Sequence, residues 1–319
     1  MNREEPISNI ILQRIDTASS ITLVAHIRPD GDAIGSVLGF GSALQAYGKP
    51  VSMAFEETLP QRFRYLNIEN EPAINGDENI IIALDCADQP RMAKSFTDKH
   101  IDINIDHHAT NTQFATLNYV NDKAAATAEI IFDLLQEWSM PIPVSAANAL
   151  LMGIITDTIG FRTPNTTAHT LRVAAQLMEK GAQLTDTYQR ALTDVSWEAS
   201  LLWSYALSKL QKEENIIYTV ITCEDREKSG YAGRDDADLT NFLSSIQDAE
   251  ISILFNQQGE NACKVSWRSR SEVNVATIAA QFGGGGHPAA AGAEIGLSLQ
   301  KTQQDVLRAT KNYLKKIHN

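Results

Sequence analysis

Short apolar runs alternate with longer helical patterns through the first half of the chain. Four runs are short and rich in Ile, Val and Leu, as buried parallel strands are: Ile21–Ala25, Val51–Phe55, Ile80–Leu84 and Asp102–Ile105. Helical periodicity covers four further stretches: Ala33–Tyr47, Ala124–Trp138, Val144–Ile155 and Thr166–Lys180. This alternation predicts an α/β fold in which a mostly parallel sheet is flanked by helices on both faces.

The pattern changes in the second half of the chain. Asp186–Gln211 is helical but irregular, and we interpret it as a connector. Beyond it, three apolar runs predict strands: Ile216–Thr222, Ile251–Asn256 and Lys264–Trp267. Helical patterns accompany them at Asp236–Ser244, Val275–Phe282 and Gln300–Ile317. We therefore expect a first domain at residues 1–188, a helical connector at 189–214 and a smaller α/β domain at 215–319.

The composition indicates a soluble globular protein. Of the 319 residues, 43% are hydrophobic and 21% are charged, which separates this chain from disordered ones. The longest apolar run, Ala149–Ile155, is far shorter than the roughly 20 residues that cross a bilayer. The first residues, MNREEP, lack the basic-then-apolar order of a signal peptide. We expect a cytoplasmic protein with no membrane partner.

Cysteine spacing and net charge narrow the possible chemistry. Cys86, Cys223 and Cys263 lie far apart and form no CxxC pair, so we expect three core thiols rather than disulfides or a cysteine zinc site. With 27 basic and 39 acidic residues the net charge is -12, which argues against wrapping long duplex nucleic acid. An anionic substrate remains compatible with this charge if metal ions or local basic residues reverse the field at one site.

The residues suited to chemistry are concentrated in five short segments. Four are in the first half: His26-Ile27-Arg28-Pro29-Asp30-Gly31-Asp32, Asp85, Asp106-His107-His108 and Asp157. The fifth, Gly283-Gly284-Gly285-Gly286-His287, is in the second half. Its glycine N–H groups could approach an anion closely, and the nearby Arg268 and Arg270 could grip a phosphate. Both arginines could face the same side, because they alternate on a strand-like segment.

Side chains just past the carboxyl ends of parallel strands converge on one crevice of a doubly wound sheet. We therefore expect seven side chains to meet: His26, Asp30, Asp32, Asp85, Asp106, His107 and Asp157. Five carboxylates at close range repel one another unless protons or cations neutralise them. Such oxygen-rich sets with imidazoles suit Mn²⁺ or Mg²⁺, and two ions about 3.5–4 Å apart can clamp a phosphoryl group. The pattern predicts metal-assisted phosphoester hydrolysis.

Each segment also has a purely structural interpretation. Asp32 could be the N-cap of the helix that follows it, and Asp85 could be an ordinary loop residue. The glycine run could be a flexible turn, and either arginine could be a surface charge. Three histidines without such a context, His100, His169 and His318, are expected to be surface or capping residues.

Taken together, the segments resemble the four motifs of the DHH phosphoesterase superfamily, in order: His26-x-x-Pro29-Asp30-x-Asp32, Asp85, Asp106-His107-His108 and Asp157. The segment Gly284-Gly285-Gly286-His287-x-x-Ala290-Ala291-Gly292 resembles the DHHA1 nucleic-acid-binding module. The chain's compact size is similar to that of the NrnA-type group of oligoribonucleases and phosphoadenosine-phosphate phosphatases. This resemblance implies a DHH domain, a DHHA1 domain and an active site in the cleft between them.

The resemblance also implies residue roles. Two Mn²⁺ ions, with Mg²⁺ or Co²⁺ as alternatives, would share Asp85 as a bridging and catalytic ligand. The ligands of one ion would be His26, Asp30 and Asp85, and those of the other would be Asp32, Asp85, His107 and Asp157. His108 would act on the scissile phosphate, while Asp106 would orient a histidine from behind. The substrate would be bound by His108, Arg268, Gly285, Gly286 and His287.

The leading hypothesis is hydrolysis of very short oligoribonucleotides, of about two to five nucleotides, to nucleoside 5′-monophosphates. Activity on 3′-phosphoadenosine 5′-phosphate (pAp) accompanies it. One alternative is a phosphodiesterase of cyclic-dinucleotide turnover that acts on linear dinucleotides such as pApA. Others are an inorganic pyrophosphatase, a long-strand DNA exonuclease and a non-catalytic nucleotide-binding module. The glycine module counts against the pyrophosphatase, and the complete ligand set counts against the non-catalytic module. Base preference, polarity of digestion and oligomeric state have no signal in the sequence.

Overall fold

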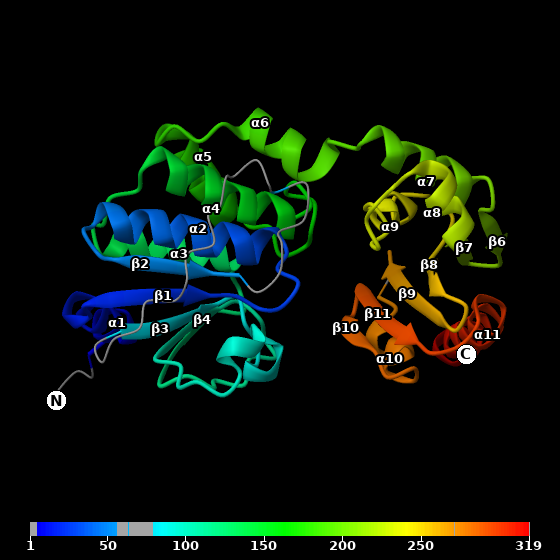
Figure 1. The fold of residues 1–319 in the computed structure, drawn as a ribbon, viewed down its shortest axis with the longest axis horizontal. Coiled ribbons are helices and arrows are strands. Elements are labelled where there is room, and N and C mark those ends of the chain that lie inside the picture. Colours follow the sequence, from blue (N-terminus) through cyan, green and yellow to red (C-terminus); the bar gives the residue numbers. More distant parts are fainter. Residues whose placement is uncertain (1–4, 56–62, 64–78, 271, 319) are drawn as a thin grey trace. The chain divides into compact units, whose positions relative to one another are not determined.

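The computed structural model describes residues 5–55, 63, 79–270 and 272–318, which form two compact units (Figure 1). The first unit is Met1–Asp194 and the second is Val195–Asn319. Each has its own sheet and its own hydrophobic core. The domain limits expected from the sequence, with a separate connector at 189–214, stay a prediction.

The first unit contains a five-stranded sheet in the order β2-β1-β3-β4-β5, and all four neighbouring pairs are parallel. Its strands are β1 (Ser20–Val24), β2 (Val51–Ala54), β3 (Asn79–Leu84), β4 (Ile103–Asp106) and β5 (Leu117–Val120). The first four lie within one residue of the predicted limits, whereas β5 was not predicted. The order of the strands reverses between β1 and β3. In doubly wound sheets, such a reversal opens a crevice at the carboxyl ends of the two strands.

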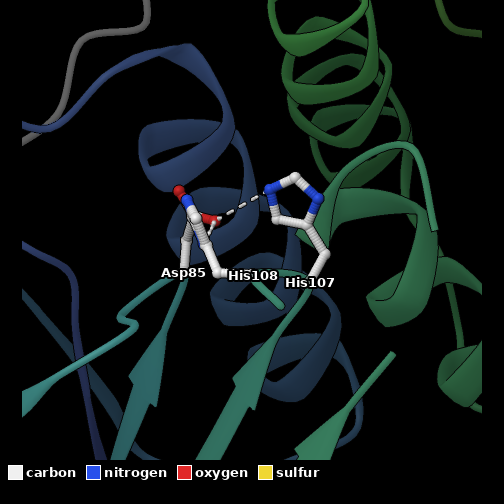
Figure 2. A group of neighbouring side chains, drawn as sticks. All are labelled: Asp85, His107 and His108. Atoms are coloured by element: carbon white, nitrogen blue, oxygen red, sulfur yellow. Dashed lines mark ion pairs between the residues drawn. The ribbon is translucent and has the colours of Figure 1, made fainter. Parts of the chain in front are cut away.

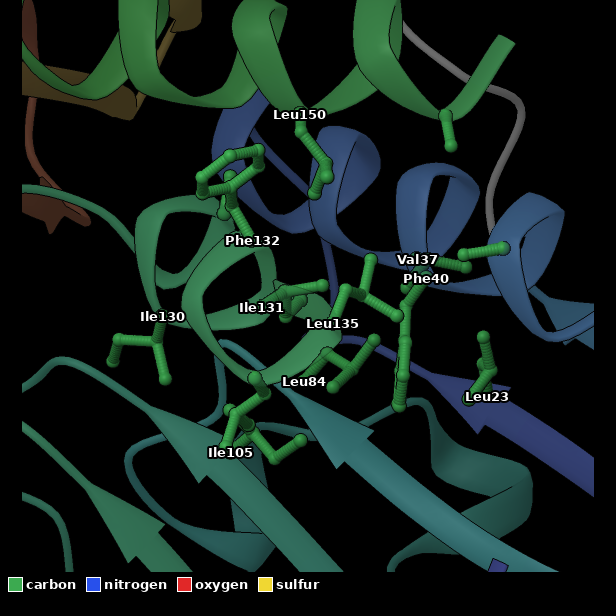
Figure 3. Close-up of a cluster of buried hydrophobic side chains, with 14 of the residues drawn as sticks. Leu23, Val37, Phe40, Leu84, Ile105, Ile130, Ile131, Phe132, Leu135 and Leu150 are labelled. Atoms are coloured by element: carbon green, nitrogen blue, oxygen red, sulfur yellow. The ribbon is translucent and has the colours of Figure 1, made fainter. Parts of the chain in front are cut away.

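Helices cover this sheet as the α/β pattern predicted. They are α1 (Ile7–Thr17), α2 (Gly31–Ala46), α3 (Thr127–Glu137), α4 (Val144–Asp157), α5 (Ala168–Glu179) and α6 (Leu184–Tyr188). Side chains from α2, α3 and α4 meet those of the strands in the main core, among them Phe40, Leu84, Ile131 and Leu150 (Figure 3). A smaller cluster that includes Val24, Ala83 and Phe96 lies against the 3-10 segments Gln89–Arg91 and Lys94–Phe96. The predicted fold class is confirmed.

Helices α2 and α4 touch through their backbones. A Cβ atom added at Gly35 would lie 2.5 Å from the carbonyl oxygen of Ala149 and 2.8 Å from the backbone nitrogen of Gly153. Only glycine permits this approach, which brings the start of α2 close to the end of α4. Asp32 and Asp157 lie at those two helix ends.

The second unit is built on a six-stranded sheet in the order β10-β11-β9-β8-β7-β6, in which only β7 and β8 are parallel neighbours among the described strands. Its strands are β6 (Gln211–Glu213), β7 (Ile216–Ile221), β8 (Ile251–Gly259), β9 (Ala262–Ser269), β10 (Gly285–His287) and β11 (Ala290–Ile295). Its helices are α7 (Trp197–Leu207), α8 (Cys223–Ser229), α9 (Leu239–Leu243), α10 (Val275–Ala280) and α11 (Leu299–His318). One core contains Trp267 with residues of α10 and α11, and another contains Leu254 with residues of α7 and α9.

The structure bears on two predictions from the sequence, one about membrane-spanning helices and one about the cysteines. Within the described residues, no helix is both long enough and apolar enough to cross a membrane. Cys86 and Cys263 are buried thiols, as predicted, and none of the three cysteines is in a disulfide. The prediction for Cys223 was wrong, because it begins the short surface helix α8 and is exposed.

Candidate metal centre

The loop between β1 and α2 holds the first group of polar side chains. The backbone nitrogen of Ile27 donates to the carbonyl of Arg91 at 2.8 Å, which fastens this loop to the segment after β3. The Nδ1 atom of His26 lies 2.8 Å from the carbonyl oxygen of Ile27 and donates to it, since a carbonyl can only accept. The other ring nitrogen, Nε2, lies 3.7 Å from Asp85 Oδ2.

Asp30 and Asp32 cap two different helices. Asp30 is the N-cap of α2, because its Oδ1 accepts from the backbone nitrogens of Asp32 and Ala33 at 3.0 and 3.1 Å. The interpretation of Asp32 as the cap of its own helix is therefore wrong. Asp32, only 1% exposed, instead accepts from the backbone nitrogens of Thr127 and Ala128 at the start of α3, at 2.6 and 3.0 Å.

Asp85 follows β3 with a left-handed backbone, at φ 58°. Its N–H donates to the carbonyl of Ile105 at 3.0 Å, so the turn is held against β4. The carboxylate is 2% exposed, and its Oδ1 accepts a 2.8 Å hydrogen bond from the hydroxyl of Thr127. A non-glycine residue with positive φ beside polar groups is typical of a functional site.

His107 lies at the centre of the carboxylates. Its Nδ1 donates to the carbonyl of Ala124 at 3.4 Å, which leaves Nε2 as the lone-pair nitrogen. That Nε2 is 3.7 Å from Asp85 Oδ1, 3.7 Å from Asp157 Oδ2 and 4.0 Å from Asp32 Oδ2. Figure 2 shows the ring of His107 turned toward Asp85, and His108 Nδ1 also lies 3.7 Å from the same oxygen, Asp85 Oδ1. A lone pair among three carboxylates is the arrangement of a ligand nitrogen.

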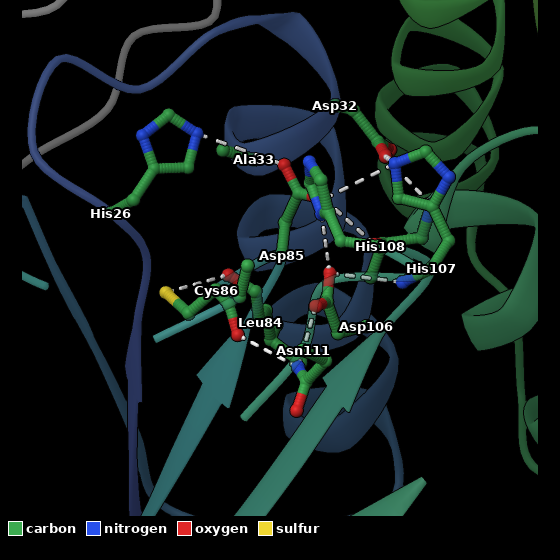
Figure 4. Close-up of polar contacts among 12 residues, drawn as sticks. His26, Asp32, Ala33, Leu84, Asp85, Cys86, Asp106, His107, His108 and Asn111 are labelled. Atoms are coloured by element: carbon green, nitrogen blue, oxygen red, sulfur yellow. Dashed lines mark hydrogen bonds and ion pairs between the residues drawn. The ribbon is translucent and has the colours of Figure 1, made fainter. Parts of the chain in front are cut away.

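Asp106 supports both histidines from below (Figure 4). Its Oδ1 accepts from His108 Nδ1 at 2.7 Å and from the backbone nitrogen of His107 at 2.9 Å. Its Oδ2 accepts from the side chain of Asn111 at 2.6 Å. Burial would raise the pKa of Asp106, but the hydrogen bonds from His108 and Asn111 outweigh it and lower the pKa. Asp106 is therefore an ionised support for the ring of His108.

The negative charge of each carboxylate makes ionisation of its neighbours less favourable and raises their pKa values. Burial, followed by the charge of Asp85, raises the pKa of Asp32 to about 7. Burial and Asp30 raise the pKa of Asp85 to about 7, and burial and Asp32 do the same for Asp157. Protons or cations relieve this mutual repulsion.

The pKa values of His107 and His108 are also raised. Burial would lower the pKa of His107, but the charges of Asp32, Asp85 and Asp157 outweigh it and raise the pKa. For His108, burial is outweighed by the hydrogen bond to Asp106 and by nearby carboxylates, which together raise the pKa to about 9. The cluster therefore attracts protons, and by the same electrostatics it attracts cations.

Among the residues that the structure describes, three groups of donor atoms could hold metal ions, each with its atoms within 4.8 Å of one another. They are His26 with Asp30 and Asp85, Asp32 with His107 and Asp157, and Asp85 with His107 and His108. The first two groups lie on opposite sides of Asp85, since its Oδ2 faces His26 and its Oδ1 faces His107. Oxygen donors combined with neutral imidazole nitrogens suit Mn²⁺, Mg²⁺ and similar ions. The residues present fit a pair of divalent cations.

Two of the candidate substrate residues of the second unit, Arg268 and His287, lie in one row across the sheet. On neighbouring strands His287 pairs with Ala290, and Ala290 pairs with Arg268, so these three residues stand side by side across β10, β11 and β9. Arg268 alternates with the buried Trp267 and therefore lies on the opposite face of the sheet from it. Burial lowers the pKa of Arg268, against the charges of Asp236 and Asp238.

The glycine run is a turn followed by a strand rather than a flexible loop. A Cβ atom at Gly284 would lie 2.2 Å from the carbonyl oxygen of Gly292, and one at Gly286 would lie 2.4 Å from that of Ala290. Gly285 meets nothing within 4 Å, so its backbone is open on that side. Close pairing of β10 with β11 therefore requires glycine at 284 and 286.

Arg270 does not share the row of Arg268. It follows β9, and its guanidinium donates to the carbonyls of Ser245 and Ile246 at 2.9 and 2.8 Å. His100, His169 and His318 contact Thr116, Asp133 and Glu250 at the surface, as expected.

Two polar side chains of the site, Thr127 and Asn111, were not predicted. Their contacts join segments far apart in the chain, and no spacing in the sequence indicates them.

The sequence of this chain matches two family descriptions. Residues 20–154 match the N-terminal domain of the DHH family, and residues 202–316 match the DHHA1 domain. The chain therefore belongs to the DHH phosphoesterase family, as the motifs indicated.

Individual proteins similar to this chain have more specific names than the family descriptions. A Thermus thermophilus protein named bifunctional oligoribonuclease and PAP phosphatase NrnA is 36% identical, over 92% of this chain and 90% of that protein. The cyclic-di-AMP phosphodiesterase GdpP of Bacillus subtilis is 26% identical over 98% of this chain but only 50% of that protein. A crystal structure of an exopolyphosphatase-related protein from Bacteroides fragilis has a TM-score of 0.87 at 24% identity, over 97% and 96% of the two chains, and so shares the fold.

Proposed function

We propose that this chain is a two-metal phosphoesterase. It hydrolyses oligoribonucleotides of about two to five nucleotides to nucleoside 5′-monophosphates and also removes a phosphate from pAp. The observation that carries the proposal is the position of Asp85, whose two oxygens face His26 and His107 at 3.7 Å each. The name of the Thermus relative supports the choice of substrates. The reaction is assigned to the cytoplasm.

The metal ligands in this proposal are divided around Asp85. His26, Asp30 and Asp85 would hold one ion, and Asp32, Asp85, His107 and Asp157 would hold the other. Bound Mn²⁺ ions would supply positive charge to the phosphoryl group and lower the pKa of the attacking water. Two imidazole ligands favour Mn²⁺, with Mg²⁺ and Co²⁺ as alternatives.

His108 acts as a proton donor toward the phosphoester. Its Nδ1 is occupied by Asp106, so Nε2 is the nitrogen that can donate to a phosphate oxygen or to the leaving oxygen. Asp106 stabilises the protonated ring, because it is an ionised partner at 2.7 Å. A proton donor that stays charged at neutral pH suits a departing alkoxide.

We assign substrate binding to His108 together with Arg268, Gly285, Gly286 and His287. The row formed by Arg268, Ala290 and His287 supports this, because the small central residue leaves space between a guanidinium and an imidazole. The net charge of -12 favours short substrates over long duplexes, since a long strand would meet repulsion beyond the site.

A second candidate substrate is a linear dinucleotide such as pApA. The likeness to GdpP, whose name includes cyclic-di-AMP, favours it. This candidate uses the same centre and differs only in base and length preference. Comparing pApA with cyclic-di-AMP and with mixed diribonucleotides at equal concentration would separate a dedicated enzyme from a general one.

The proposal is tested with metal-free protein, Mn²⁺ and a 5′-phosphorylated diribonucleotide, with products followed by chromatography. We expect two 5′-monophosphates per substrate, and no product in the presence of chelator. Asp85→Asn should abolish turnover, whereas Asp98→Asn, at an exposed position, should leave it unchanged. Full turnover by Asp85→Asn, or no turnover by metal-loaded wild type, would contradict the proposal.

A further inference from the structure

The first turn of α3 contacts two buried carboxylates of the metal centre, Asp32 and Asp85. The N-cap of α3 is Ala126, which has no side chain to cap the helix. Asp32, 95 residues earlier, takes that place by accepting from the N–H of Thr127 and, through its other oxygen, of Ala128. The cap thereby fixes the plane of the Asp32 carboxylate, and the positive end of the helix favours its charge.

Thr127 also holds the second carboxylate. Its hydroxyl donates to Asp85 Oδ1 at 2.8 Å, and Thr127 itself is fully buried. Asp85 Oδ1 faces His107, and Oδ2 faces His26. The hydroxyl therefore selects the rotation of the carboxylate in which each oxygen faces a different group of donor atoms.

We propose that Thr127 is the positioning residue of the metal centre, through its backbone N–H on Asp32 and its hydroxyl on Asp85. The inference rests on the proposed function, because it assumes that Asp85 bridges two cations. Thr127 sets the angle between the two carboxylates before any cation binds. Without the hydroxyl, Asp85 can rotate about its side-chain bonds, and a cation must then restore the bridging orientation during binding.

Three substitutions test this role by Mn²⁺ titration calorimetry of the metal-free full-length chain. Thr127→Val keeps the branched shape but lacks the hydroxyl, Thr127→Ala lacks both, and Thr127→Ser keeps the hydroxyl. We expect the two hydroxyl-free variants to bind Mn²⁺ about 10–100-fold more weakly, as when other supports of metal ligands are removed. Serine should restore an affinity close to that of wild type.

Thr302→Val is the matched control. Thr302 is a fully buried threonine of α11 whose hydroxyl has no hydrogen-bond partner, so its loss should leave Mn²⁺ binding unchanged. Circular dichroism of each variant verifies the fold.

The outcomes separate this inference from the proposed function. Absence of Mn²⁺ binding by wild type would contradict the proposed function itself. Normal binding by wild type and by a folded hydroxyl-free variant would overturn only the role of Thr127. Equal weakening in the serine and valine variants would also overturn it, because shape rather than the hydroxyl would then be responsible. Failure of both hydroxyl-free variants to fold, with serine folding normally, would assign the hydroxyl to folding and overturn the inference as well.

Discussion

At the scale of single residues, the site depends on hydrogen bonds that fix which ring nitrogen and which carboxylate oxygen is available. His108 Nδ1 donates a hydrogen bond to Asp106 Oδ1, and Asp106 Oδ2 accepts another from the side chain of Asn111. This chain of contacts occupies Nδ1 and raises the pKa of the ring to about 9, and we assign the donor role toward the substrate to Nε2. In the proposed mechanism, Asp106 would influence the reaction through His108 without touching the phosphate.

We predict that Asp106→Asn lowers kcat by about 10–100-fold and moves the alkaline limit of activity to lower pH. The carboxylate contributes to a pKa of about 9 for His108, so removing its charge lowers that pKa. The protonated donor is then lost at lower pH than in wild type. The measurement is kcat against pH at saturating Mn²⁺.

The matched control is Asp133→Asn, which breaks an exposed Asp–His pair with a 2.8 Å contact to His169. Its pH profile should coincide with that of wild type. An unchanged profile for Asp106→Asn would mean that His108 does not act as the titrating donor.

The sequence predicted which residues would meet but not how they are held. Parallel strand ends explain why His26, Asp85 and His107 converge, because buried apolar runs mark those ends clearly. No pattern in the sequence indicates that Asp30 caps α2 whereas Asp32 caps α3. This division depends on where α3 begins relative to α2, which is set by packing between distant segments. The same reason explains why Thr127 and Asn111 were missed.

At the scale of elements, the contact between α2 and α4 sets the distance between Asp32 and Asp157. Backbone atoms of α4 occupy the space beside Gly35, so a side chain at this position could be accommodated only if α4 moved. The space beside Gly39, one turn later, is taken by the side chain of Leu150, with Cγ at 2.5 Å from an added Cβ. A side chain can change its rotamer, whereas a backbone must move as a unit.

We predict that Gly35→Ala destabilises the first unit by about 1–3 kcal/mol and weakens Mn²⁺ binding. The two helices must separate, which moves Asp32 away from Asp157. Gly39→Ala should cost less and leave Mn²⁺ binding intact, because Leu150 can adjust. Chemical denaturation and Mn²⁺ titration measure the two effects, and equal behaviour of the variants would contradict this account of the helix contact.

Elements with a continuous apolar pattern were predictable, and those without one were not. Strands β1 to β4 are recognisable from their short apolar runs, which are rich in Ile and Leu in β1 and β3. Strands β10 and β11 are largely Gly and Ala, residues that do not favour strands by themselves. They are strands because β11 pairs with β9 and β10 pairs with β11. β5 is half-buried, and Asn118 interrupts its apolar residues.

At the scale of the whole molecule, the charge cluster links stability to pH. Asp32, Asp85 and Asp157 have pKa values of about 7 in the folded chain, against 3.8 as the ordinary value. The folded state therefore holds protons that the unfolded chain has lost between about pH 4 and 7, so stability falls as pH rises through this range. The raised pKa values of His107 and His108 act in the same direction at higher pH.

We predict that the chelator-treated protein has a lower Tm at pH 8 than at pH 5.5, and that Mn²⁺ raises Tm most at pH 8. Cations replace the missing protons and bind the folded state alone. Asp85→Asn should weaken the pH dependence, because it removes one buried charge. A Tm that rises from pH 5.5 to pH 8 in chelator would contradict this electrostatic account.

The central claim is that Asp85 joins two cations, and anomalous diffraction from a Mn²⁺-soaked crystal tests it most directly. The account predicts two manganese peaks about 3.5–4 Å apart on opposite sides of the Asp85 carboxylate. One should lie beside His26 and Asp30, and the other should lie among Asp32, His107 and Asp157. A single peak, or two peaks that do not share Asp85, would contradict it.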